Sequence, residues 1–98
     1  MTNHKINVAI AEACGWTPDN RGLGWLSPHG YYAPEPDYCS DLNAMHEAEK
    51  TLTDDQREVF YPRNLGAWQS PFNVIYATAR QRAEAFLRVM GKWEEVQP

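Results

Sequence analysis

Apolar residues recur at steps of three and four in the last quarter of the chain, which is the spacing of one face of an α-helix. The stripe consists of Ala79, Ala83, Met90 and the two expected core anchors, Phe86 and Leu87. Thr78 and Gln81 have the spacing of a capping box at the start of a helix, and Gly91 suits the position just after its end. The pattern therefore predicts a helix over Thr78–Met90 that packs on the core through this stripe.

A second helix is predicted over Ser40–Leu52, with Ser40 as the residue that caps its first turn. Its apolar stripe runs through Leu42, Met45, Ala48 or Glu49, and Leu52. Another face presents polar side chains at the same steps, namely Asn43, His46, Glu47 and Lys50. This helix carries the densest set of groups that could take part in binding or chemistry, so its polar face is the first candidate site.

Two further segments have helical spacing. Lys5–Cys14 is followed by Gly15, which suits the left-handed backbone position that ends many helices. Thr53–Tyr61 begins with capping-box spacing, a threonine followed three residues later by a glutamine. We expect Pro62 to end this second segment, or at least its regular hydrogen bonding, because proline has no backbone N–H to continue the helical hydrogen bonds.

The remaining segments predict strands and connections. Leu23–Tyr32 predicts a β-hairpin around a Ser-Pro-His-Gly turn, and Phe72–Tyr76 has the β-branched and aromatic bias of a strand. Thr17–Gly22 has turn chemistry, and Ala33–Tyr38 reads as an extended connector because it contains two prolines. Together the elements predict one α+β domain over residues 1–98, with a small antiparallel sheet and about three to four helices.

Composition narrows the class of protein. Of 98 residues, 43% are hydrophobic and 22% charged, as in globular domains, and the net charge is −4 at pH 7. This charge argues against general nucleic-acid binding, which relies on clustered lysine and arginine. The sequence has no apolar run of about eighteen residues that would predict a membrane span, and no leader that would predict secretion. We therefore expect no membrane association, and Cys14 and Cys39 as thiols in a reducing cytosol.

Three segments occur in the order A-E-A-C-G-W at 11–16, D-Y-C-S-D-L-N-A-M-H-E-A-E at 37–49, and A-T-A-R-Q-R-A-E-A-F-L at 77–87. Together they resemble the small bacteriophage proteins of the phage ABA sandwich domain family. The resemblance implies a phage or prophage origin, and hence the host bacterial cytoplasm, and it implies an α/β/α layered sandwich. None of the three segments is a catalytic signature, and the resemblance implies no activity because the family as a whole has no established function.

The residues that could bind a metal or carry catalysis do not form a known motif. The possible metal ligands lack the close pairs of zinc sites; they are His4, Cys14, His29, Cys39 and His46. Neither phosphate-binding glycine motif occurs. Cys14 ends a helix, where the dipole raises a thiol pKa, whereas Cys39 precedes a helix start, which favours a thiolate. We assign no catalytic residue, metal or cofactor, and the sequence favours a protein without enzymatic activity.

The predicted ligand-binding set combines the central helix with the hairpin. If the hairpin packs on that helix, Trp25 and Tyr31 form a flat apolar wall beside Asn43, His46 and Glu47. We expect such a protein to bind a host protein or a small polar ligand. Two alternatives stay open: a small hydrolase or nucleotide-modifying enzyme that uses His46, and a structural or assembly factor of the phage particle. The many aromatic residues at element ends also predict a twofold homodimer.

Overall fold

The computed structural model describes residues 1–19, 24–67, 69–70 and 72–94. In chain order its elements are α1 (Asn3–Ala13), β1 (Thr17–Pro18), β2 (Trp25–Leu26), β3 (Tyr32–Ala33), α2 (Leu42–Glu49), a π-helical turn η1 (Gln56–Phe60), α3 (Tyr61–Asn64), α4 (Phe72–Ile75) and α5 (Ala79–Val89). The predicted α+β fold with a small antiparallel sheet is confirmed. In the described part of the chain, no helix is long and apolar enough to cross a membrane.

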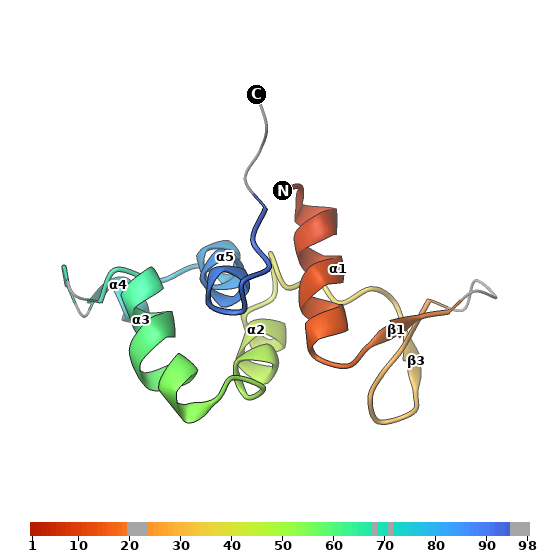
Figure 1. The fold of residues 1–98 in the computed structure, drawn as a ribbon. Helices are drawn as coiled ribbons and strands as arrows, with labels where there is room; N and C mark the ends of the chain where they lie inside the picture. The colour runs from red at the N-terminus through yellow and green to blue at the C-terminus, as the bar shows by residue number, and fades with distance from the viewer. Residues whose placement is uncertain (20–23, 68, 71, 95–98) are drawn as a thin grey trace.

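The molecule is elongated, with extents of 46 × 35 × 21 Å, and its elements lie side by side along its length (Figure 1). The sheet is an outer layer at one end, and α1 separates it from the other helices. Helices α2 and α5 follow α1, and α3 and α4 form the opposite end. The beginning of the chain lies near its last described residue, because the α-amino group of Met1 donates to the carbonyl of Glu94 at 3.5 Å.

The core is organised around α5, which packs against α1, α2 and α3. Its predicted stripe is confirmed, since four of the five positions are buried and Met90 is half-buried. The largest fully buried side chains come from three helices and are Ile6, Ile10, Met45, Phe86 and Leu87. The capping box predicted at Thr78 is present, with the threonine and Gln81 side chains each bonded to the other's backbone N–H.

The end of α1 turns the chain toward the hairpin. Gly15 has a φ of 93°, so the left-handed position predicted for it is confirmed. Its amide donates to the carbonyl of Glu12, and the amide of Trp16 donates to the carbonyl of Ala11. These two bonds form a Schellman motif, which satisfies carbonyls at the helix end and folds Trp16 back over the last turn.

Helix α2 is shorter than predicted, and the choice of cap was wrong. The cap is Asp41, whose Oδ1 accepts from the amides of Asn43 and Ala44 at 2.9 and 3.3 Å. A carboxylate at this position also complements the positive end of the helix dipole, which a serine hydroxyl at position 40 cannot do. At the other end, Thr51 leaves the helix, and its hydroxyl donates to the carbonyl of Ala48 at 2.7 Å.

The predicted hairpin is confirmed, as β2 pairs antiparallel with β3. Buried Ser27 fixes its turn, because Oγ accepts from the amides of His29 and Tyr31 at 3.2 Å each. Strand β1, which the sequence suggested only as turn, adds to the other edge of β2. Its Pro18 occupies an edge strand, where a missing donor is tolerated. Asn20, Arg21 and Gly22 of the predicted turn, and Leu23 of the predicted hairpin, lie outside the described residues.

The strand predicted at Phe72–Tyr76 is wrong, since this segment forms α4. Local hydrogen bonds outweigh its β propensity. The hydroxyl of Ser70 accepts from the amide of Phe72 at 3.3 Å, and the side-chain amide of Asn73 donates to the carbonyl of Gly66 at 2.9 Å. The segment also pairs with none of the described strands, so an extended backbone would gain no contacts with a neighbouring strand among them.

The helix predicted at Thr53–Tyr61 is present and begins with the expected capping box, but Pro62 does not end it. The helix continues to Asn64 through the π-helical turn η1, in which the amide of Tyr61 donates to the carbonyl of Gln56. This wider turn changes the hydrogen-bond partners just before the proline. It therefore accommodates both the missing N–H and the ring that would clash in a regular helix.

Candidate functional site

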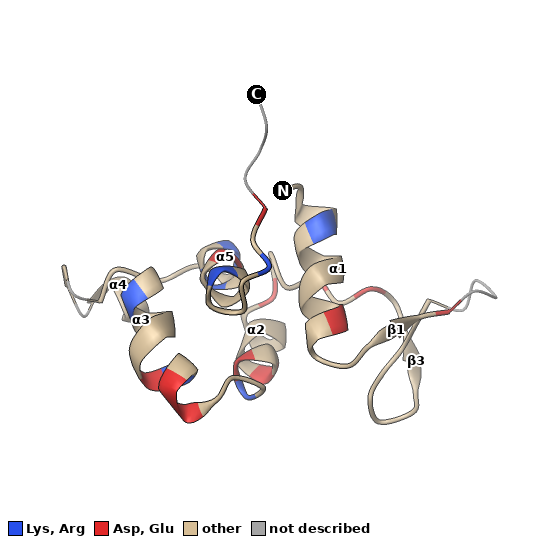
Figure 2. Ribbon diagram, in the orientation of Figure 1, with Lys and Arg blue, Asp and Glu red and all other residues tan. Residues whose placement is uncertain are grey.

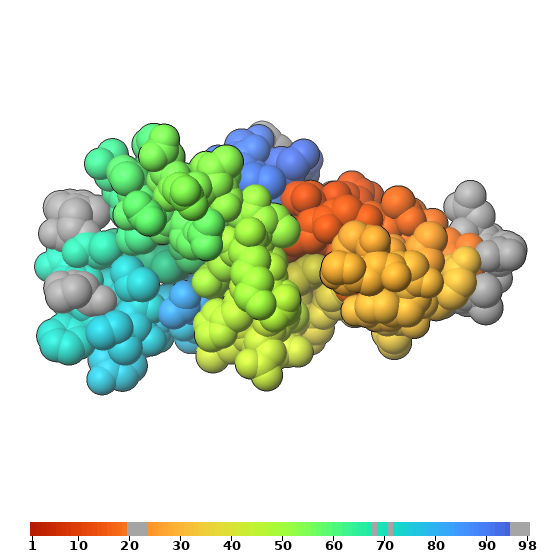
Figure 3. All heavy atoms as spheres, turned by 90° about the horizontal axis from the view of Figure 1, so that it is seen from below, coloured from red at the N-terminus to blue at the C-terminus, as the bar shows by residue number. Residues whose placement is uncertain are grey.

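A cavity of about 520 Å³ lies between the hairpin turn, the end of α1 and helix α2. On the face seen in Figure 3, the hairpin (orange) and α2 (yellow-green) lie next to each other. The rings and aliphatic walls come mainly from Trp16, Pro28, Tyr31, Pro36 and Tyr38. Glu47 of α2 and Lys50, the residue that follows this helix, supply charged groups. We call this cavity the hairpin pocket. Its size and mixed lining are those of ligand sites in other proteins.

Two contacts hold the hairpin against the end of α1. A Cβ added to Gly15 would lie 3.4 Å from the Cβ of Pro28, so the turn of the hairpin packs directly on the helix end. The rings of Trp16 and Tyr31 meet edge to face, with centroids 5.8 Å apart and an interplanar angle of 86°. Because Tyr31 keeps 53% of its surface exposed, it offers one ring face to a ligand while its neighbour fixes its position.

The polar edge of the hairpin pocket is an exposed ion pair. Lys50 Nζ donates to Glu47 Oε1 at 2.9 Å, and the two side chains are 69% and 73% exposed. Such a pair contributes only about 0.2–1 kcal/mol, so a charged group on a ligand can replace either partner at small cost. The edge can therefore bind an anionic or a cationic group.

The surroundings of the thiol in the hairpin pocket disfavour its thiolate form, which is the nucleophilic form of a cysteine. Burial raises the pKa of Cys14, and hydrogen bonds to Thr51 and Tyr38 oppose the shift only in part. Burial also raises the pKa of Cys39, which corrects the expectation that its place before a helix favours a thiolate. Neither cysteine takes part in a disulfide, as predicted. At neutral pH both are thus protonated thiols.

The structure brings together only part of the predicted ligand-binding set. Tyr31 and Glu47 line the hairpin pocket. Trp25 does not, because it is only 9% exposed and belongs to the core. Asn43 and His46 are exposed on α2, outside the described lining of the pocket. The sequence missed Trp16 and Tyr38; the one signal for Trp16 was its place directly after the glycine that ends α1.

A second polar arrangement lies between α2, α3 and α5, and the sequence did not predict it. Glu49 Oε1 accepts from the hydroxyl of Tyr61 at 2.7 Å and from Nη1 of Arg82 at 3.4 Å. Arg82 also donates to the carbonyls of Val74 and Ala77, at 2.6 and 3.3 Å. The Glu49 and Arg82 side chains are only 19% and 12% exposed, so this network is a structural tie that fixes the end of α4.

The network gives the protein a predicted alkaline instability. Burial, followed by the hydrogen bond to the carboxylate of Glu49, raises the pKa of Tyr61 above its ordinary value of 10.0. The folded state therefore retains a proton that the unfolded chain releases above pH 10.0, so this stability is present below that pH and lost as pH rises further. Urea denaturation should show a declining free energy of unfolding between about pH 10 and 12.

The variant Tyr61→Phe should flatten that decline, after a fixed loss of about 1–3 kcal/mol at neutral pH for the missing hydrogen bond to a charged group. Burial raises the pKa of Tyr38 as well, so Tyr38→Phe should remove a separate part of the decline. An unchanged slope in Tyr61→Phe would show that this hydroxyl is not held protonated by its surroundings.

Among the charged residues that the structure describes, both signs are interspersed and do not by themselves assign a site. In Figure 2, lysine and arginine are spread over several helices with aspartate and glutamate between them. Among the described residues, no three histidine, cysteine, aspartate or glutamate side chains come together as possible metal ligands. Comparisons with models of protein families, with curated proteins and with solved structures found no match.

Proposed function

We propose that this chain is a non-enzymatic phage accessory protein, acting in the host bacterial cytoplasm, that binds a small ligand in the hairpin pocket. The ligand has a flat apolar body and a polar or charged edge. Its body stacks on Tyr31 beside Trp16, and its charged edge exchanges with the Glu47–Lys50 pair. The resemblance to the phage ABA sandwich domain family supports the phage origin.

One observation carries the ligand proposal: an aromatic wall and an exposed ion pair line the same cavity. Apolar pockets with a few convergent polar groups are the usual form of small-molecule sites. The enzyme alternative has less support, since His46 lies on the exposed face of α2, apart from the hairpin pocket, and the thiol of Cys14 is protonated.

Exposed apolar side chains on α4 and on the residue that follows it favour a second function, binding to a protein. Phe72, Ile75 and Tyr76 are 61%, 64% and 76% exposed. Grouped apolar side chains on a surface often mark protein contacts. This supports the host-protein partner, the homodimer and the role in phage assembly that the sequence left open, without choosing among them.

A thermal-shift screen tests the ligand proposal. The compounds are nucleosides, nucleotides, aromatic amino acids, and the carboxylic acids and amines related to those amino acids. All of them combine a flat ring with a polar edge. A ligand at about ten times its Kd stabilises the protein by about 1.4 kcal/mol and should raise the melting temperature by about 5–10 °C. Tyr31→Ala should lose most of that rise with any such ligand, and Lys50→Met should lose most of it with an anionic ligand.

Asn43→Ala and His46→Ala are the matched controls, because both residues are exposed on α2 outside the pocket lining. The rise should persist in both. A rise that is lost in these two variants but kept in Tyr31→Ala would move the site to the polar face of α2, as the sequence predicted. An equal rise in all four variants would reject both sites, and no rise with any compound would favour the protein partner.

A further inference from the structure

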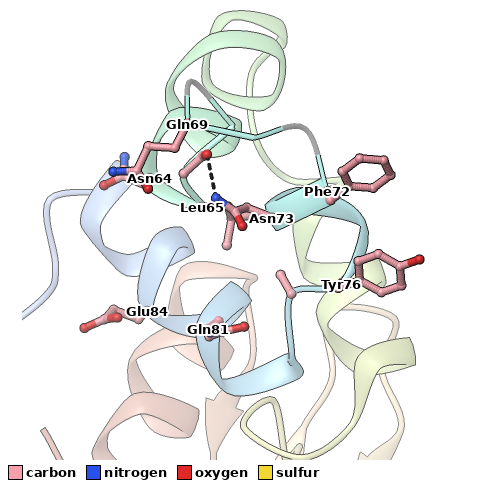
Figure 4. Close-up of a pocket in the computed structure, with 10 residues that line it drawn as sticks. Asn64, Leu65, Gln69, Phe72, Asn73, Tyr76, Gln81 and Glu84 are labelled. Atoms are coloured by element: carbon pink, nitrogen blue, oxygen red, sulfur yellow. Dashed lines mark hydrogen bonds between the residues drawn. The ribbon is translucent and has the colours of Figure 1, made fainter.

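A second cavity, of about 510 Å³, lies at the other end of the molecule, between the loop after α3, helix α4 and the first turns of α5. Four side-chain amides line it: Asn64, Gln69, Asn73 and Gln81. Figure 4 shows Asn64 and Gln69 on one side of this space and Gln81 with Glu84 on the other. We call it the amide pocket; it shares no lining residue with the hairpin pocket.

Three of the amides are held in place by the backbone. The Nδ2 groups of Asn64 and Asn73 donate to the carbonyls of Phe60 and Gly66, each at 2.9 Å, and the second bond is drawn in Figure 4. Oε1 of Gln81 accepts from the amide of Thr78 at 2.9 Å. Each side chain thus uses one end of its amide, and its other end bonds to no other described residue and can serve a ligand: an acceptor oxygen from each asparagine and a donor NH₂ group from the glutamine.

The pocket holds little net charge. The acidic group among its described lining residues is Glu84, which accepts from Nη2 of Arg88 at 3.3 Å, and the two are 39% and 40% exposed. Fixed amide donors and acceptors around a nearly neutral space suit hydroxyl groups, each of which donates one hydrogen bond and accepts others. They do not suit a phosphate, which favours arginine and lysine.

Two aromatic rings stand at the rim. Phe72 and Tyr76 are stacked, with centroids 6.3 Å apart and an interplanar angle of 23°, and their exposed fractions are 61% and 76%. Figure 4 shows both rings on the same side, pointing out of the cavity. They form an exposed aromatic surface next to the amides, and an exposed ring face of this kind can pack on the C–H face of a sugar ring.

We propose that the amide pocket is a binding site for a neutral saccharide of two or three units. One sugar ring enters the cavity, where its hydroxyls bond to Asn64, Asn73 and Gln81. The next ring lies along the Phe72–Tyr76 surface. The bond from Arg82 to the carbonyl of Val74 holds α4, and with it this surface, against the rest of the fold. This site is independent of the ligand proposed for the hairpin pocket.

Nuclear magnetic resonance tests the assignment directly, because side-chain NH₂ groups of asparagine and glutamine give their own signals. Cellobiose, maltotriose and N,N′-diacetylchitobiose would be titrated to millimolar concentrations, with spermidine as a cationic comparison. At least one saccharide should shift the NH₂ signals of Asn73 and Gln81 in a saturable way, while spermidine leaves them in place.

Two variants probe the two parts of the site without removing a structural bond. Gln81→Glu keeps the acceptor of the capping box but loses the NH₂ donor. Tyr76→Ala removes half of the aromatic surface from a position that is 76% exposed. Each should weaken saccharide binding by about five- to tenfold at an unchanged melting temperature.

The control is Tyr31→Ala, which alters only the hairpin pocket and should bind the saccharide as well as the original protein does. The proposal fails if none of the three saccharides shifts the NH₂ signals, if Gln81→Glu and Tyr76→Ala bind as tightly as the original protein, or if spermidine is the better ligand. Whether or not a ligand binds in the hairpin pocket does not affect the result of this saccharide test.

Discussion

Phe86→Ala should lower the free energy of unfolding by about 3–5 kcal/mol, the cost of removing a buried aromatic ring and leaving a cavity. Phe86 is fully buried on α5, which packs against three other helices, so the cavity would open where they meet. A domain of this length has about 5–15 kcal/mol of stability in total. The variant should therefore be marginally stable, with a melting temperature lower by at least about 12 °C.

Phe72→Ala is the matched control, since the same atoms are removed from a ring that is 61% exposed. Its free energy of unfolding should change by no more than about 0.5 kcal/mol. Urea denaturation of both variants, with the slope against urea compared as well, separates a loss of stability from a change of the unfolded state. Equal losses in the two variants would mean that α5 is not the centre of the core.

The sequence predicted those parts of the fold that depend on neighbours along the chain. The apolar stripe of α5, its capping box at Thr78, and Gly15 at the end of α1 each need residues no more than about eleven positions apart. The hairpin turn is equally local, because Ser27 bonds to amides two and four residues later. Such features can be predicted from the sequence because the residues that form them lie close together along the chain.

The predictions failed where a distant or unusual contact decides the backbone. Phe72–Tyr76 has strand propensity, yet it folds as a helix that Arg82 ties to α5 through the carbonyl of Val74. Pro62 would end a regular helix, and a π-helical turn just before it keeps the helix going. Neither the tie nor the change of helix type leaves a periodic signal in the sequence.

The ligand-binding set depended on a condition that the sequence could not decide, namely that the hairpin packs on the central helix. Of that set, Tyr31 and Glu47 line the hairpin pocket. The sequence could not say which aromatic residues would be buried, so Trp25 was taken for the wall that Trp16 provides. The hairpin's position depends on how the turn packs on the end of α1, which is a tertiary contact.

The second prediction with a large effect concerns the Glu49–Arg82 pair. Arg82→Met should lower the free energy of unfolding by about 2–4 kcal/mol. The substitution keeps an aliphatic stem but leaves Glu49 without its cation in a site where the two side chains are only 19% and 12% exposed. The carbonyls of Val74 and Ala77 lose their donor as well.

Arg57→Met is the control for this prediction, because Arg57 pairs with Asp54 at 3.1 Å with both side chains well exposed, and its loss should cost no more than about 1 kcal/mol. A double-mutant cycle then isolates the buried pair. Glu49→Leu combined with Arg82→Met should be less destabilised than the sum of the single variants by about 1–3 kcal/mol, because the double variant leaves no unpaired charge behind. Strict additivity would show that the two side chains stabilise the fold separately, and that the attraction between their charges contributes nothing to holding α2 against α5.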